Sequence, residues 1–375
     1  MRCSWIALLF LFAAAAGAED SPFEFDGHTK LRAVGQTYPD DSLLRDLAGS
    51  SSLDTIGELR LNLAAKKYDW SFHADYQALG LYSEFLALGL PNDDRRLFDF
   101  TKVVADGSDY ALVHRLDRFW AGYAGRKLVV RAGRQALSWG NGLYFHPLDL
   151  VNPFDPTTID TEYKTGDDMV YAQYLRDNGD DLQAAVVFRR DPLTGERRSD
   201  EGTVAVKYHG FAGENEYDVL IGENFGDTVV GLGAVGSLGG AVWRGDLVIT
   251  DADDETEVEF VTNVSYSWVW AERNVSGSAE YYRSGEDRDY FAGSLMIEMT
   301  PLWTLTPTLI GNFDDPSALL QVVTQYSLGD NTTFLGSLNL PIGANGTEYG
   351  GPETGVPGRY LSFDVGVFAQ LAWYF

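Results

Sequence analysis

The chain has 375 residues, a formal net charge of -27 and a mean hydropathy of -0.16. Its 55 acidic side chains against 28 basic ones argue against a nucleic-acid partner, whose phosphates they would repel. The single cysteine, Cys3, lies in the N-terminal segment, so a chain that has lost this segment holds no thiol for disulfides, metal binding or catalysis. Beyond that segment no run reaches the roughly 18 apolar residues of a transmembrane helix, so strands must make any membrane span.

Residues 1–18 have the pattern of a secretory signal peptide. Arg2 precedes an apolar run from Trp5 to Ala16 that is too short to span a bilayer, and Ala16-Gly17-Ala18 matches the small-residue site that a signal peptidase accepts. We therefore expect export with removal of residues 1–18. No linker rich in proline or serine divides residues 19–375, which we expect to form one domain.

Eighteen segments alternate between apolar and polar residues as strands do. They are residues 24–37, 54–66, 69–79, 111–124, 127–138, 167–176, 182–190, 202–211, 215–223, 228–237, 241–251, 256–270, 274–284, 289–300, 303–313, 318–328, 332–342 and 359–375. The pattern is clearest in residues 256–270, where Phe260 and Trp268 share an apolar face opposite Glu257 and Glu259. Such a segment suits a strand with one face in hydrocarbon and the other in water.

The connections between these segments alternate between short and long. The short ones are residues 66–69, 125–126, 178–180, 239–240, 272–274, 301–303 and 329–331. Short periplasmic turns opposite longer extracellular loops are typical of outer-membrane barrels. We predict an all-β fold, a closed antiparallel transmembrane barrel of about 18 strands, with 16 as the alternative. A soluble β-sandwich competes with it, but residues 256–270 exceed the five or six residues of an ordinary soluble strand.

The last segment alternates from Phe363 to the final residue and ends in Trp373 and Phe375 on one face. A terminal aromatic of this kind resembles the assembly signal of bacterial outer-membrane β-barrels. The resemblance implies that Trp373 and Phe375 are recognised by the barrel assembly machinery. It also implies an integral outer-membrane protein in contact with lipid and lipopolysaccharide.

The polar faces of the strands predict which side chains line the lumen. The predicted pore-lining residues are Lys30, Arg32, Glu58, Arg60, His73, Asp75, Arg118, Arg131, Arg134, Glu257 and Glu259. The predicted residues of the fourth and fifth strands fall on both odd and even positions, so they cannot all face the lumen in a regular strand. We expect a bulge or a register shift there. Opposed basic and acidic walls would create a transverse field that selects solutes. Alternatively, the charges pair with one another and stiffen the barrel.

The connection at residues 140–166 is longer than the 12 to 15 residues of ordinary loops. Its polar residues include Asp149, Asn152, Asp155, Asp160, Glu162 and Lys164. A long loop after the fifth strand resembles the constriction loop of porins, and Arg134-Gln135 with Trp139-Gly140 resembles the strand end of alginate-export-type barrels. The resemblance implies a loop that folds inward and narrows the pore. The alternative is a loop that merely covers the mouth.

No catalytic constellation is visible. The five histidines, and serines such as Ser71 and Ser138, do not stand in the spacing of known hydrolase or metalloprotease motifs. The acidic run Asp251, Asp253, Asp254 and Glu255 lacks the glycine-punctuated pattern of a calcium loop. We therefore expect no enzyme, cofactor or metal site.

The sequence favours an outer-membrane channel for passive diffusion of small polar or charged solutes. One alternative is a barrel conduit that depends on a periplasmic partner and sheathes an exported polymer or an electron-transfer protein. Another is a surface adhesin or an outer-membrane enzyme.

Overall fold

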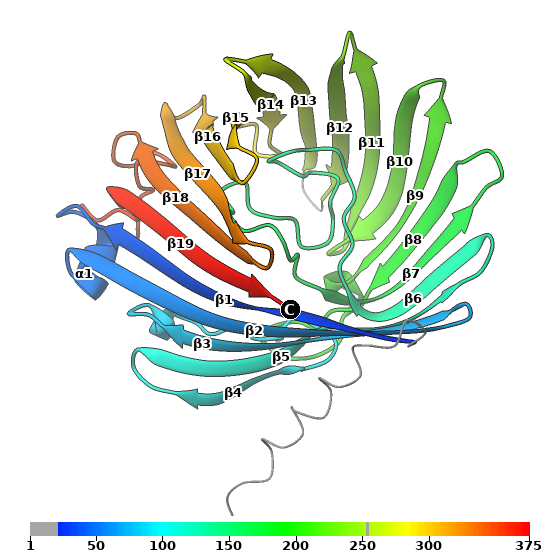
Figure 1. The fold of residues 1–375 in the computed structure, drawn as a ribbon, viewed down its shortest axis with the longest axis horizontal. Coiled ribbons are helices and arrows are strands. Elements are labelled where there is room, and N and C mark those ends of the chain that lie inside the picture. The colour runs from blue at the N-terminus through cyan, green and yellow to red at the C-terminus, as the bar shows by residue number, and fades with distance from the viewer. Residues whose placement is uncertain (1–21, 253–254) are drawn as a thin grey trace, which may run out of the picture.

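A computed structural model describes residues 22–252 and 255–375, and its strands close into one antiparallel barrel (Figure 1). Each barrel strand pairs with the next along the chain, apart from β4, and β19 pairs with β1 to complete the ring. The predicted all-β closed barrel of 18 strands is confirmed. The signal peptide and its cleavage site lie outside the described residues.

The bounds of the elements follow chain order. The barrel strands are β1 (Phe23–Thr37), β2 (Ser51–Lys67), β3 (Trp70–Tyr82), β5 (Tyr110–Ala124), β6 (Leu128–Gln135), β7 (Asp167–Leu175), β8 (Asp181–Val187), β9 (Thr203–Ala212), β10 (Asn215–Asn224), β11 (Asp227–Leu238), β12 (Ala241–Asp251), β13 (Thr256–Trp270), β14 (Arg273–Arg283), β15 (Asp289–Thr300), β16 (Trp303–Asn312), β17 (Ser317–Gly329), β18 (Thr332–Ile342) and β19 (Val365–Tyr374). The other elements are α1 (Leu43–Ala48), η1 (Leu86–Leu88), β4 (Thr101–Asp106) and η2 (Ser199–Glu201). None of the helices in the described parts of the chain is long and apolar enough to cross a membrane.

The segments expected from the sequence match the barrel strands to within about three residues at either end, with one exception. The last strand begins at Val365 rather than at residue 359. Gly358 adopts a φ of 74°, a left-handed conformation that a regular strand does not accommodate, so the chain is still turning there. The sequence analysis also missed β4, in which five of the six residues are exposed, because it lacks the alternation of a half-buried strand.

Residues 93–101 close a gap in the wall beyond the last residue of β6 and the first residue of β7. On one side, the Leu116 amide of β5 donates a hydrogen bond to the Phe100 carbonyl. On the other side, the Arg190 amide, just beyond β8, donates one to the Arg95 carbonyl. The barrel wall is therefore continuous although β6 has only eight residues.

The connection between β6 and β7, residues 136–166, lies inside the ring of strands (Figure 1). Its Leu137, Trp139, Leu148 and Val151 pack in an apolar cluster on the inner faces of β7 to β12. The wall residues of this cluster are Met169, Tyr171, Ala185, Val187, Ala205, Leu220, Val229 and Val248. The hydrophobic core of the protein thus lies within one side of the lumen, which the loop fills.

The two chain ends meet at the seam of the barrel. The Gly27 amide donates to the Phe375 carbonyl and the Phe375 amide donates to the Gly27 carbonyl, each over 3.0 Å. A Cβ atom at Gly27 would lie 2.4 Å from the Arg60 carbonyl oxygen and 2.9 Å from the Phe375 ring, so glycine permits this close approach. The Trp373 ring lies 5.1 Å from the Phe375 ring.

Deleting Phe375 should impair insertion while leaving secretion intact, because it removes both backbone hydrogen bonds and the aromatic end of the closing strand. The measurement is the amount of heat-modifiable barrel in outer-membrane fractions. Phe188→Ala is the control, since Phe188 is also exposed but lies just beyond β8. Wild-type amounts of barrel after the deletion would contradict the role assigned to the C-terminal residue.

Candidate functional site

One side of the inward loop is capped by two acidic side chains of the wall. The Glu280 carboxylate on β14 accepts hydrogen bonds from three successive loop amides, those of Leu143, Tyr144 and Phe145, over 2.6 to 3.0 Å. The Asp246 carboxylate on β12 accepts bonds from the amide nitrogen and the side-chain Nδ2 of Asn141 over 2.6 and 2.7 Å. A loop inside a barrel has few other partners for its amides, so these carboxylates fix its path.

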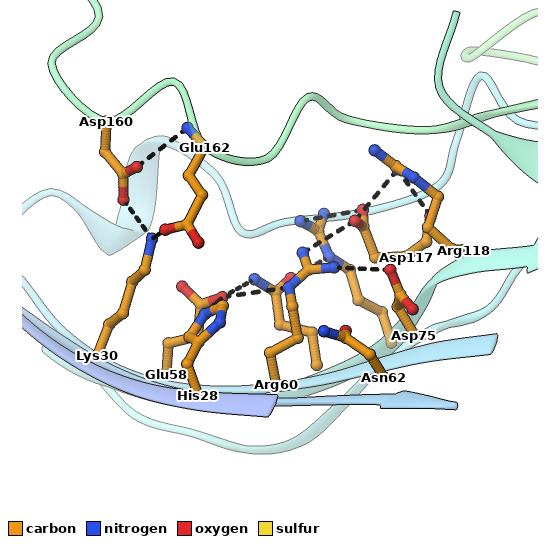
Figure 2. A network of polar contacts seen from close by, with 12 residues as sticks. His28, Lys30, Glu58, Arg60, Asn62, Asp75, Asp117, Arg118, Asp160 and Glu162 are labelled. Atoms are coloured by element: carbon orange, nitrogen blue, oxygen red, sulfur yellow. Dashed lines mark hydrogen bonds and ion pairs between the residues drawn. The ribbon is translucent and has the colours of Figure 1, made fainter. Parts of the chain in front are cut away.

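The opposite side of the loop is held by ion pairs with β1 (Figure 2). The Lys30 ammonium lies 2.7 Å from the Asp160 carboxylate and 2.6 Å from that of Glu162. The Arg32 guanidinium lies 3.2 Å from Asp160 and 2.8 Å from Glu58. We call residues 155–164 the distal arm of the loop; its attachment to β1 consists of charged contacts rather than apolar packing.

Below the distal arm, the basic residues of the first strands belong to a buried ionic network (Figure 2). Arg60 lies 2.9 Å from Asp117 and 3.4 Å from Asp75, and its guanidinium lies 4.2 Å from the centre of the Tyr163 ring. Arg60 is only 1% exposed, because the loop covers it. Charges buried in this way are tolerated only when each has partners.

His28 and His73 extend this network along the wall. His28 Nε2 lies 3.3 Å from Glu58, and the Gln77 amide donates to the same carboxylate over 2.7 Å. His73 Nε2 lies 2.7 Å from Asp75, and its ring stacks on Trp120 at 5.5 Å. Each of these histidines therefore has a carboxylate partner.

The ends of the loop are tied to each other and to β5. The Lys164 ammonium contacts the Asp149 carboxylate at 2.5 Å and donates to the Leu137 carbonyl over 2.6 Å. Arg118 donates to the Lys164 carbonyl and lies 3.2 Å from Asp117. Burial lowers the pKa of Lys164 and raises that of Asp149, although each is opposed by the charge of the other.

Two predicted pore-lining arginines lie elsewhere in the wall. Arg134, at the end of β6, lies 3.0 Å from Asp93 and 2.9 Å from Asp168, and it also donates to the Phe98 carbonyl. It is fully buried and so ties residues 93–101 into the wall. Arg131 lies 4.8 Å from the Tyr171 ring centre and 5.6 Å from that of Trp120. The expected irregularity lies in β5, where the register with β3 shifts between the Asp75–Arg118 and Tyr76–Leu116 pairs and leaves Asp117 as the extra residue.

The remaining predicted residues lie on the other side of the lumen or in the loop. Glu259 on β13 accepts a hydrogen bond from the Tyr282 hydroxyl, and Glu257 is exposed two residues earlier. Asn152 has a φ of 50° and donates to the Thr165 carbonyl over 3.5 Å. Asp155 accepts the Thr157 amide over 2.7 Å, which forms the turn leading into the distal arm.

A cavity of about 640 Å³ remains between the distal arm and the inner wall formed by β1, β2 and β17 to β19. Polar side chains on its wall include Arg32, Gln36 and Asn339, and apolar ones include Phe363 and Phe368. Its charged lining residues are Lys30, Arg32, Glu58, Arg60, Arg115, Asp117, Asp160 and Glu348. Four are basic and four are acidic, so the charged lining has no net formal charge.

The pore-lining assignment remains a prediction, and the structure refines what it implies. Lys30 and Arg60 are each 1% exposed, so they meet the loop rather than open water. Of the three basic residues predicted on the first two strands, Arg32 is the most exposed, with 23% of its side chain accessible. No group of three or more histidine, cysteine, aspartate or glutamate residues in the described chain is arranged to hold a metal ion.

Asp246, Glu280 and Tyr163 are among the site residues that belong to neither the predicted pore-lining set nor the predicted loop set. Glu280 and Asp246 lie on strands whose alternation was visible, so their inward direction was predictable. Their hydrogen bonds to the loop were not, because these depend on where residues 141–145 cross the lumen.

No protein-family model matches the chain, and no curated protein matches its sequence. Solved structures with similar folds include OccAB4 of Acinetobacter baumannii (TM-score 0.55, 8% identity, 95% of this chain and 99% of that chain). Another is Wzi, described as a carbohydrate-binding β-barrel involved in group 1 capsule assembly in Escherichia coli (TM-score 0.56, 10% identity, 99% of this chain and 89% of that chain). OprB of Pseudomonas putida at low pH also matches (TM-score 0.48, 12% identity, 100% of this chain and 98% of that chain). At these identities the likeness concerns the fold.

The closed 18-stranded barrel and its structural neighbours define a porin-like β-barrel. Such a barrel is an integral protein of the bacterial outer membrane, as the alternation and the terminal aromatic predicted. The likeness to alginate-export-type barrels remains a prediction.

Glu280→Gln should loosen the loop where it crosses the lumen, because a neutral amide replaces an acceptor shared by three backbone amides. Hydrogen bonds to a charged group contribute about 1.5 to 3 kcal/mol, so exchange of these amides should accelerate at least about tenfold. Hydrogen exchange of residues 143–145 measures this. Glu298→Gln is the control, since Glu298 pairs with Asn274 near the short-turn end. Equal protection in all three proteins would rule out anchoring by Glu280.

Acidification should release the distal arm. Burial acts to raise the pKa of Asp160, but its hydrogen bond to Lys30, the Lys30 charge, the Glu162 amide and Arg32 together hold that pKa below its usual value. Asp160 therefore stabilises the attached distal arm at pH values above its unfolded-state pKa of about 4. This stabilisation is lost as the pH falls through the lower pKa of Asp160 in the folded protein. Single-channel conductance should rise reversibly on acidification below about pH 4.

Asp160→Asn separates the contribution of Asp160 from those of Glu162 and Glu58, which contact the same basic residues. The variant should already show increased conductance at pH 7 and only a small further change in acid. A wild-type conductance that stays constant or falls on acidification would refute the release.

Proposed function

We propose that the protein is an outer-membrane channel through which small polar solutes diffuse passively, with its bore set by residues 136–166. The observation that carries this proposal is the position of the loop, which lies within the lumen and is bonded to opposite walls. The cavity of about 640 Å³ left beside it has the size of a small-solute site. Small solutes, rather than folded proteins, fit such a space.

The loop contacts favour a constriction over a mobile plug. On one side, Glu280 and Asp246 cap its amides and an apolar cluster packs against it. On the other side only the distal arm borders the cavity, and it is held by Lys30 and Arg32. The firmly packed half fixes the position of the loop, while the charged half faces the remaining space.

The balanced charges of this cavity give it no preference for solutes of either sign. Arg32 is paired with Glu58 and Asp160, and Arg115 donates to Gln77 over 2.6 Å. Paired charges create a weaker long-range field than a row of free ones. We further propose that the assembly machinery inserts the barrel through Trp373 and Phe375, and that lipopolysaccharide surrounds its outer rim.

Replacing residues 142–161 with a short glycine-serine linker should increase unitary conductance, because it removes most of the distal arm, including Asp160 and its contacts with Lys30 and Arg32. Planar-bilayer recordings of refolded barrel measure this, with heat-modifiable migration as the test that the shortened barrel has folded. Replacing the loop at residues 191–197 with a linker of the same composition is the control, since Asp191 and Glu196 form an exposed turn outside the lumen loop.

An unchanged conductance in the folded, shortened barrel would exclude residues 142–161 as the constriction. A wild-type barrel that conducts only when a periplasmic protein is added would instead favour the partner-dependent conduit.

A further inference from the structure

A second cavity, of about 630 Å³, lies between the loop and the inner wall at β13 to β15. Phe145 and residues 155–157 of the loop form one side, and side chains of Tyr282 and Tyr290 form part of the other. It adjoins the first cavity, because Thr157, Glu348 and Tyr349 line both. We call this second space the acidic aromatic chamber.

The chamber has a one-sided charge, unlike the cavity beside β1. Its charged lining residues are Asp155, Glu257, Glu259, Glu286 and Glu348, and its described lining includes no lysine, arginine or histidine. The cavity beside β1 has four basic and four acidic residues in its lining. Of these two cavities, the chamber is the one with an excess of negative charge.

Neutral donors, rather than cations, contact the inner carboxylates of the chamber. Glu259 accepts from the Tyr282 hydroxyl, and Glu348 accepts from the Tyr290 hydroxyl over 2.9 Å and from Asn312 over 2.8 Å. Within the described chain, Glu257 and Glu259 form no ion pair. These hydrogen bonds position the carboxylates without neutralising them, and Glu257 and Glu259 keep their full charge.

The basic residues nearest the chamber are engaged at its borders. Arg288 lies 3.2 Å from Glu286, and Arg283 pairs with Asp287 and Asp289 over 2.8 and 2.9 Å. On the far side of Glu257, Arg189 lies 2.8 Å from Asp167 and donates to Thr203. Arg288 also interacts with Glu348 and Tyr290, so it reduces the charge at that edge of the chamber, whereas Arg283 and Arg189 pair with carboxylates outside the lining.

Aromatic rings provide a second feature that suits a cation with an organic stem. Phe145 stacks on Tyr282 with ring centres 4.6 Å apart and an interplanar angle of 12°. Tyr290 lies 5.4 Å from Phe145 and 5.9 Å from Tyr282. Aromatic faces attract ammonium and guanidinium groups, and their apolar surface accommodates a hydrocarbon stem.

We propose that the acidic aromatic chamber is a binding site for organic cations, amines or guanidinium compounds with a short apolar stem, and that it makes the channel selective for them. This inference rests on the proposed channel function and names its solute class. A metal ion is a poorer fit, because the described carboxylates do not converge as a ligand group. Selectivity then arises from the wall that borders the acidic aromatic chamber. The arginines of β1 and β2, on the opposite wall, contribute little because acidic neighbours match their charges.

Butylammonium is the probe, because it combines one ammonium group with a short apolar stem. In planar bilayers, wild-type barrel should show a reversal potential of cation-selective sign in a potassium chloride gradient, and butylammonium should reduce its current. Butanol and magnesium chloride, which supply the stem alone and the charge alone, should reduce it less. Calorimetric titration of the refolded barrel in detergent measures butylammonium binding without requiring conduction.

Substitutions in the chamber test the carboxylates and the aromatic rings separately. The double substitution Glu257→Gln and Glu259→Gln should weaken butylammonium binding about five- to tenfold, as expected for losing two partly exposed charge contacts. Tyr282→Phe should retain most of the binding, since it keeps the ring, whereas Phe145→Leu should weaken it. Glu298→Gln is the matched control, because it removes a carboxylate paired with Asn274 outside the chamber and should leave binding unchanged.

Two outcomes would overturn the proposal: no calorimetric binding of butylammonium to wild-type barrel, or equal binding to wild type and the double variant. Weaker binding to Glu298→Gln than to the double variant would place the site elsewhere. If butylammonium binds as expected but the barrel does not conduct, the channel function fails while the binding site stands. If the barrel conducts with no preference for cations, the channel function stands and the selectivity fails.

Discussion

The structure depends on how a chain segment inside a barrel satisfies its backbone amides. Residues 141–145 cross the lumen away from any ladder, and an unpaired buried amide is costly. Asp246 and Glu280 supply negatively charged acceptors from the wall, which form stronger hydrogen bonds than neutral groups do. The position of the loop, the apolar packing beside β7 to β12 and the two cavities beside the distal arm follow from these anchors.

The two sides of the loop are held by different forces, which gives them different sensitivities. Apolar burial of Leu148 and Trp139 is independent of pH and is little affected by salt. The bonds of Asp160 and Glu162 to Lys30 depend on ionisation and, where they are exposed, on screening. Any movement of the loop should therefore begin at the distal arm and leave the packed half in place.

The strands were predictable because a membrane barrel imposes the same two-residue period on every span, and the turns mark where each span ends. The loop contacts were not, since they join residues far apart in sequence, as Lys30 and Asp160 do. β4 was missed because both of its faces are largely exposed. The alternation of polar and apolar residues placed Lys30, Arg60 and Glu259 on the inner face. It gave no information on which of these charges the loop would cover.

Pairing, rather than the number of charges, decides which wall exerts a field on a passing solute. The wall at β1 and β2 has more basic residues, yet Arg60 lies between Asp75 and Asp117, and Lys30 lies between Asp160 and Glu162. At β13 to β15 the carboxylates of Glu259 and Glu348 meet phenol and amide donors that carry no charge. A wall that looks basic in the sequence therefore borders a cavity of balanced charge, whereas the acidic aromatic chamber is electrostatically acidic.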